Sequence, residues 1–125
     1  MPNNQNPLTQ YLQYVTVETY VNDTAAAVEL IKYIIGNQQA PTAHVEDVTS
    51  CYWWEGKVEQ EKEVRVSFDL PADRAMKVVK SIELIHPYQL PAIMVRPLVP
   101  GTTDTGKWLI DPAYTPAKAN ATNLL

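Results

Sequence analysis

Residues 42–68 read TAHVEDVTSCYWWEGKVEQEKEVRVSF. The first half, residues 42–54, is rich in β-branched and aromatic side chains, which suit a pleated surface. The second half ends in residues 63–68, where apolar and polar side chains alternate with the period of two that is typical of a strand. Gly56 and a charged segment lie between the two halves. This stretch therefore predicts a long β-hairpin.

The segments around this hairpin alternate between strand and helix patterns. Residues 14–20 are dense in β-branched and aromatic side chains and predict a strand, and residues 24–35 have apolar positions at helical spacing. A second helix is expected after Pro71 and ends near His86, because Pro87 cannot continue it. Residues 91–99 predict a fourth strand. The order β-α-β-β-α-β predicts an α+β, ferredoxin-like sandwich, in which two helices cover one face of a four-stranded sheet.

The domain organisation follows from length and composition. With 125 residues, of which 46% are hydrophobic and 19% charged, the chain suits one globular domain. We expect a disordered polar leader at 1–12, the folded domain at 13–111 and a mobile tail at 112–125. Residues 1–10 lack the basic and apolar regions of a secretory signal, and no window is apolar enough for a membrane span, so a cytoplasmic location without membrane association is expected.

The charge pattern narrows the possible partners. The net charge is −4, and ten Lys and Arg residues are scattered among fourteen acidic residues. Binding to a phosphate backbone requires clustered cations. Nucleic acid is therefore not an expected partner.

The first and fourth predicted strands carry apolar or aromatic side chains at consecutive positions, as in Tyr14-Val15 and Ile93-Met94-Val95. A sheet that faces water on one side would alternate apolar with polar residues. We therefore expect the face away from the helices to be covered by another subunit.

Two motifs, with a weaker third, carry a resemblance to a known family. Residues 48–59 read VTSCYWWEGKVE, residues 86–91 read HPYQLP, and Trp108-Leu109 follows near the end. Together they resemble the CutA family of divalent-cation tolerance proteins. The resemblance implies a homotrimer, similar to the PII signalling proteins, in which the sheets of the protomers pack together. It also implies a role in tolerance of copper and other divalent cations, no obligatory cofactor and no catalytic reaction.

The same resemblance suggests where a metal would bind. The family usually carries a cysteine in an Ala-Cys-Val segment before the hairpin, whereas this chain reads Ala43-His44-Val45. The imidazole of His44 could replace that cysteine as a ligand. His86, the only other histidine, is the second candidate ligand. Cys51 lies within the hairpin motif and is expected to be a buried small hydrophobe, since nothing basic beside it would stabilise a thiolate.

The hairpin aromatics are candidates for the trimer interface. Trp53 and Trp54 are neighbours in a strand, so their side chains point to opposite faces. We expect one to reach the protomer core and the other a subunit partner. Tyr52 belongs to the same predicted interface, and Glu59, Glu61 and Glu63 are expected to be solvated along the hairpin.

His86 has two interpretations. It could cap the end of the second helix, where a cation would suit the helix dipole. Alternatively, His86 and Tyr88 form a ligand-binding cleft between subunits with Glu55 and Lys57, able to hold an anion or a metal. Three functions remain open: a trimeric cation-responsive or ligand-sensing protein, an enzyme with an intersubunit site that uses His86 as acid or base, and a purely structural interaction module.

Overall fold

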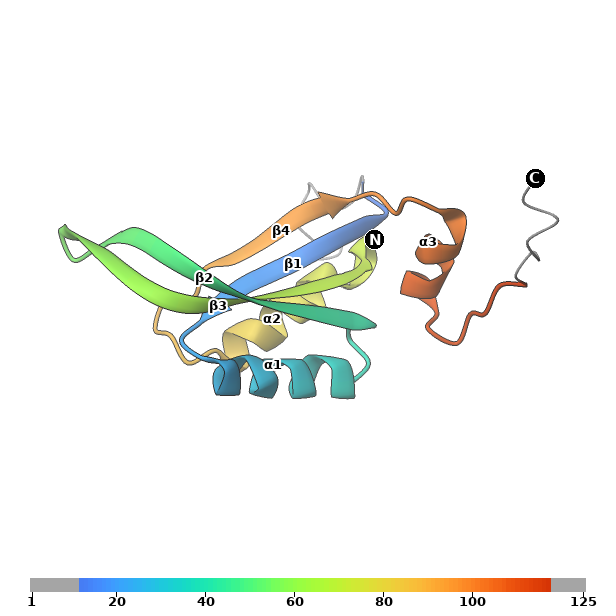
Figure 1. Ribbon diagram of the computed structural model, residues 1–125. Coiled ribbons are helices and arrows are strands. Elements are labelled where there is room, and N and C mark those ends of the chain that lie inside the picture. Colours follow the sequence, from blue (N-terminus) through green and yellow to red (C-terminus); the bar gives the residue numbers. More distant parts are fainter. Residues whose placement is uncertain (1–11, 118–125) are drawn as a thin grey trace, which may run out of the picture.

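The computed structural model describes residues 12–117, and most of the predicted leader and the end of the predicted tail lie outside that range. Strands and helices alternate along the chain (Figure 1). The elements are β1 (Tyr14–Val21), α1 (Thr24–Gly36), β2 (Thr42–Trp54), β3 (Lys57–Pro71), the 3₁₀ turn η2 (Ala72–Arg74), α2 (Ala75–Ile85), β4 (Ile93–Leu98) and α3 (Thr103–Ile110).

The four strands form one antiparallel sheet in the order β2-β3-β1-β4. Helices α1 and α2 lie against one face, and of the helices in residues 12–117 only α3 touches the other face, at the end of the sheet where Gly106 lies against the Tyr14 side chain (Figure 1). The predicted β-α-β-β-α-β order and the α+β class are therefore confirmed. We call the face away from α1 and α2 the open face.

The core lies between the sheet and these two helices. Asp23 caps α1, where its side chain accepts a hydrogen bond from the backbone N–H of Ala26 at 2.9 Å. Apolar side chains of β1, β3, α1 and α2 that face this layer are buried, since every second strand residue points at the helices. The largest of these buried side chains are Phe68, Leu30, Ile34, Leu70 and Ile82.

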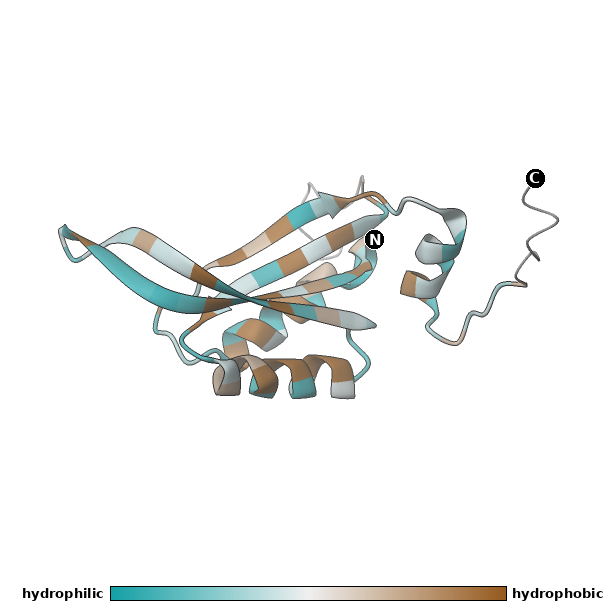
Figure 2. Cartoon of the chain, viewed as in Figure 1, coloured by the Kyte–Doolittle hydropathy of each residue, from teal (hydrophilic) through white to brown (hydrophobic). Residues whose placement is uncertain are grey.

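The open face corrects one expectation. Along β1, Val15, Val17 and Val21 point at the core, whereas Thr16 and Glu18 point to the open face. The strand therefore does alternate, and Figure 2 shows the alternating bands. The expected apolar and aromatic side chains do lie on this face, as Tyr14 and Tyr20 on β1 and Met94 and Leu98 on β4. The expectation missed Glu18, which is buried beside them as a partner of Arg96 on β4, at 2.6 Å.

One element differs from its expected form, and one segment had been assigned no secondary structure from the sequence. Strand β3 begins at Lys57, so the charged segment after Gly56 is part of the strand and only Glu55 and Gly56 form the turn. Both have positive φ, 49° and 81°, as a type I′ turn requires, and glycine adopts that conformation without strain. The segment near Trp108 is a helix, α3, capped by Thr102. Within residues 12–117, no helix is long and apolar enough to cross a bilayer.

Candidate functional site

The hairpin formed by β2 and β3 extends beyond the rest of the sheet. Strand β1 ends at Val21, opposite Val64, whereas β2 and β3 stay paired as far as Trp54 and Lys57. We call residues 48–63 the arm. Figure 1 shows the arm projecting past the ends of α1 and α2. Because no helix in the part of the chain that the structure describes covers it, side chains on both of its faces are open to contact.

The aromatic side chains of the arm are exposed. Trp53 is 74% exposed and Trp54 39%, and Val58, which pairs with Trp53, is 61% exposed. The expectation that one indole reaches the protomer core was wrong, because the core ends where the helices end. Cys51 was also expected to be buried, yet it is exposed, with its Sγ 3.8 Å from the Gln60 side-chain oxygen.

His86 lies at the base of the arm, where α2 ends. Its backbone N–H donates to the Ile82 carbonyl at 2.8 Å, which ends the helix. The Tyr88 backbone N–H donates to the ring atom Nδ1 at 3.0 Å, so the ring proton must lie on Nε2, which is 2.9 Å from the Tyr20 carbonyl and donates to it. Both ring nitrogens therefore have partners.

This geometry decides between the two interpretations of His86. Burial lowers the pKa of His86, opposed by its bond to the Tyr20 carbonyl and by the charge of Glu63. A second ring proton would have to sit on Nδ1, where it would point at the Tyr88 N–H and replace a hydrogen bond with a donor–donor contact. His86 is therefore a neutral structural link and not the cation that was expected to favour the helix dipole. Metal binding at either nitrogen would break a hydrogen bond.

Tyr88 contacts both His86 and the arm. Its ring lies edge-on to the imidazole at 4.8 Å between centroids, and its hydroxyl donates to Glu63 Oε2 at 2.6 Å. Burial, followed by the bond to Glu63, raises the pKa of Tyr88. Glu63 is itself only 7% exposed. The expectation that all three arm glutamates are solvated was therefore wrong for Glu63.

Tyr52 makes a similar contact on the arm. A hydrogen bond with Glu61 is the main cause that raises the pKa of Tyr52 to about 12. The charges of Glu61 and Tyr52 also raise the pKa of Tyr88, which indicates that the two tyrosine–glutamate pairs are neighbours. We call Tyr52, Glu61, Glu63, His86 and Tyr88 the corner cluster. Sequence analysis paired His86 with Tyr88 but missed both glutamate partners, although their period-two spacing placed them on one face of β3.

Glu55 and Lys57 do not join this cluster. They lie at the tip of the arm, where Lys57 Nζ is 3.7 Å from a Glu59 carboxylate oxygen. Six residues of strand separate Lys57 from Glu63, a span of roughly 20 Å. The predicted cleft is therefore not assembled within one chain: His86 and Tyr88 come together, and Glu55 and Lys57 stay at the far end.

His44 is also separate from His86. It pairs with Ser67 on the open face, its side chain is 65% exposed, and its Nε2 is 3.5 Å from Asp69. The structure does not bring the two predicted metal ligands together. Among residues 12–117, no group of three or more His, Cys, Asp or Glu side chains is arranged to hold a metal ion.

Three comparisons place this geometry among known proteins. A family profile described as "CutA1 divalent ion tolerance protein" matches residues 14–111. The divalent-cation tolerance protein CutA of Yersinia pestis (strain Pestoides F) is 34% identical over 100 residues, which are 79% of this chain and 84% of that protein. The crystal structure of CutA1 from Pyrococcus horikoshii has a TM-score of 0.74 at 29% identity, covering 81% of this chain and 99% of that one.

A more distant structure supports the fold alone. The periplasmic divalent cation tolerance protein CutA from Archaeoglobus fulgidus has a TM-score of 0.74 at 20% identity, covering 77% of this chain and 94% of its own. The arm and the corner cluster both lie within the residues that the family profile matches.

Proposed function

The chain belongs to the CutA1 family of divalent ion tolerance proteins, and from this premise we propose that it is a homotrimer that responds to copper. The observation that carries the proposal is the arm, a paired ribbon whose Trp53 and Val58 side chains are left exposed by residues 12–117. Exposed apolar surface of this kind marks an interaction site. Neighbouring copies of the chain would cover it.

In this trimer, Tyr52, Trp53 and Trp54 form the interface together with the open face. The open face suits an interface because its charges are already paired within the chain, as in Glu18–Arg96 and Glu46–Arg65, both at 2.6 Å. Burying paired charges costs less free energy than burying unpaired charges. Tyr14, Tyr20, Met94 and Leu98 add apolar and aromatic surface around them.

The ligand-binding cleft forms between chains. Within one chain, Glu55 and Lys57 lie at the tip of the arm and His86 with Tyr88 at its base. In the trimer, the tip of one arm lies against the base of another, which brings the four residues together. The two exposed charges of the tip would then face the tyrosine–glutamate pairs of the corner cluster.

Copper binding depends on His44 in this proposal. Its imidazole is exposed and has the Asp69 carboxylate beside it as a second donor, with remaining ligands supplied by other chains. His86 is not assigned a metal role, because both of its ring nitrogens are used. Imidazole favours Cu(II), whereas a thiolate ligand favours Cu(I).

The test is a calorimetric titration of Cu(II) into the wild type, His44→Ala, His86→Ala and Cys51→Ser. His44→Ala should weaken affinity by about tenfold or more, as loss of a ligand requires, and the other two variants should bind as the wild type does. Binding should also weaken below about pH 6, where a free imidazole is protonated. Unchanged affinity in His44→Ala, with loss only in Cys51→Ser, would move the ligand to the thiol.

The same proposal covers activity and location. We propose a sensing or tolerance protein without a catalytic reaction, located in the cytoplasm. The divalent-cation tolerance family is not a known enzyme family, which supports the first statement. A thermal-shift screen of nucleotides and small anions distinguishes the alternatives, since a ligand raises the melting temperature of a sensor or enzyme and leaves a purely structural module unchanged.

A further inference from the structure

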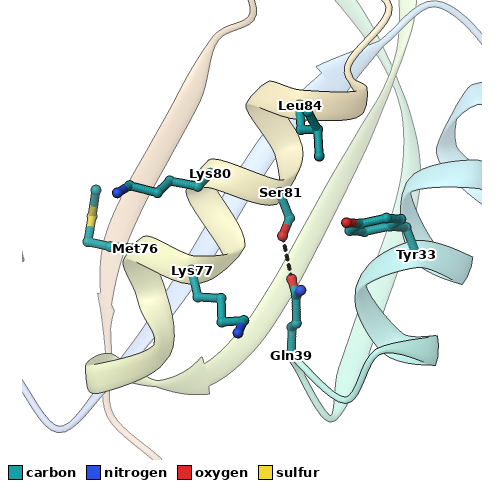
Figure 3. Close-up of a pocket in the computed structure, with 7 residues that line it drawn as sticks. All are labelled: Tyr33, Gln39, Met76, Lys77, Lys80, Ser81 and Leu84. Carbon is teal, nitrogen blue, oxygen red and sulfur yellow. Dashed lines mark hydrogen bonds between the residues drawn. The ribbon is translucent and has the colours of Figure 1, made fainter.

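A groove of about 570 Å³ lies between α1 and α2, in the helix layer and away from the arm and the open face (Figure 3). One wall is the end of α1 at Tyr33, and the other is α2 from Met76 to Leu84. Tyr33 is 36% exposed and Leu84 73%. The groove therefore offers apolar surface that the assembly proposed above does not use.

The floor of the groove is preformed and polar. Ser81 is 8% exposed, and its hydroxyl donates to the Gln39 side-chain oxygen at 2.6 Å. Figure 3 shows this bond joining α2 to the loop after α1. Because the oxygen of Gln39 is used in this way, its amide N–H groups remain as donors to a bound molecule.

The charge of the groove is positive in a chain whose net charge is −4. Lys77 and Lys80 line it, and none of the residues that line it is acidic. Elsewhere the side chains of Lys57, Arg65 and Arg96 pair with carboxylates. By contrast, neither the Lys77 nor the Lys80 side chain forms an ion pair or hydrogen bond with any residue between 12 and 117. The groove is therefore a local site for negative charge.

The positions of the two lysines indicate which kind of anion fits. In Figure 3, Lys77 points toward Gln39, whereas Lys80 points the other way, toward Met76. Two ammonium groups that diverge from one helix do not converge on a single phosphate. They match two carboxylates spaced along a chain, with an apolar side chain between them to contact Leu84 and Tyr33.

We propose that this groove docks an acidic peptide segment of a partner protein, with an apolar anchor between its carboxylates. The lysines and the Gln39 amide bind the carboxylates, and Leu84 and Tyr33 contact the anchor. Charge complementarity carries the choice of occupant, because two lysines without an acidic neighbour in the lining attract carboxylates. The site lies on the opposite side of the sheet from the proposed trimer interface, so both can be occupied together.

The test measures fluorescence anisotropy of a labelled peptide built from Asp, Glu and Leu, beside the same peptide with Asn and Gln in place of the acids. The acidic peptide should bind, and Lys77→Gln/Lys80→Gln should weaken its affinity by about tenfold or more. Leu84→Asn should weaken it as well. Lys32→Gln/Lys107→Gln, which removes the same charge outside the groove, should leave affinity unchanged.

Four results would overturn the proposal. Equal loss in both double variants would mean diffuse attraction, and equal binding of the amide peptide would mean that the lysines are irrelevant. Displacement of the peptide by inorganic phosphate at similar concentration would reassign the groove to a small anion. Lysine-dependent binding to phosphatidylglycerol vesicles, without binding of the peptide, would reassign it to a membrane surface. Light scattering on each variant shows whether assembly is intact, which keeps this result separate from the trimer proposal.

Discussion

Strands β2 and β3 each pass through two environments, the helix-covered body of the domain and the arm. Their pairing is continuous from Thr42–Asp69 to Trp54–Lys57. In the body, Val66 and Phe68 are completely buried, whereas in the arm Trp53 is 74% exposed. Strand pairing thus decides which residues share a face, but burial depends on what covers that face. In the body, α1 and α2 cover the sheet. In the arm, no helix of residues 12–117 does so, and we propose that other copies of the chain provide the cover.

The largest expected effect is in the body. Phe68→Ala should lower the free energy of unfolding by about 3–5 kcal/mol, because it leaves a cavity under two helices. Phe68→Leu, which keeps most of the volume, should cost less than about 1.5 kcal/mol. Guanidinium denaturation measures both. If Phe68→Ala lowered the free energy of unfolding by less than about 1 kcal/mol, the body would be no better packed than the arm, and the contrast between them would be wrong.

A smaller effect, of a different kind, is expected in the arm. Trp53→Ala and Trp54→Ala remove side chains that do not contact the core. Each should weaken the free energy of assembly by a few kcal/mol and thereby lower the melting temperature. The decrease should grow as the protein is diluted. Calorimetry and light scattering at several concentrations measure the two effects together. If both variants kept the wild-type melting temperature and mass, the indoles would be peripheral.

The smallest effect concerns the link between body and arm. Burial lowers the pKa of His86 from its ordinary value of 6.5, so between the two pKa values the unfolded chain binds more protons than the folded chain. The contribution of His86 to stability is therefore complete above about pH 7 and falls as pH drops through 6.5 toward the folded pKa.

Urea unfolding of the wild type and His86→Gln across this range measures that contribution. The difference in unfolding free energy between the two proteins should shrink on acidification. A difference that stayed constant for His86→Gln would mean that its ring titrates alike in both states.

The body of this fold was predictable from local patterns. Apolar spacing in residues 24–35 and the stop at Pro87 placed both helices, and β2 was predicted with its exact bounds from its β-branched and aromatic composition. The sequence pattern predicted burial wrongly in the arm, where no helix of residues 12–117 covers the strands. Cys51 and Trp53 have the composition of a core strand, and nothing local indicates that the helices end before they are reached.

The candidate site was predictable only in part. His86 and Tyr88 are two residues apart, so their contact could be anticipated from the HPYQLP motif. The bonds from Tyr88 to Glu63 and from His86 to the Tyr20 carbonyl join residues 25 and 66 positions apart, and only the folded topology reveals them. The open-face pair Glu18–Arg96 was hidden for the same reason, so the sequence predicted the apolar and aromatic side chains of that face but not the ion pair among them.

The central claim is that the arm and the open face of each chain are covered by two other copies, and the mass of the assembly in solution tests it most directly. Light scattering coupled to size-exclusion chromatography, over a range of micromolar concentrations, should give three times the 14.1 kDa of one chain, without dissociation on dilution. A stable species with the mass of a single chain at these concentrations would contradict the account.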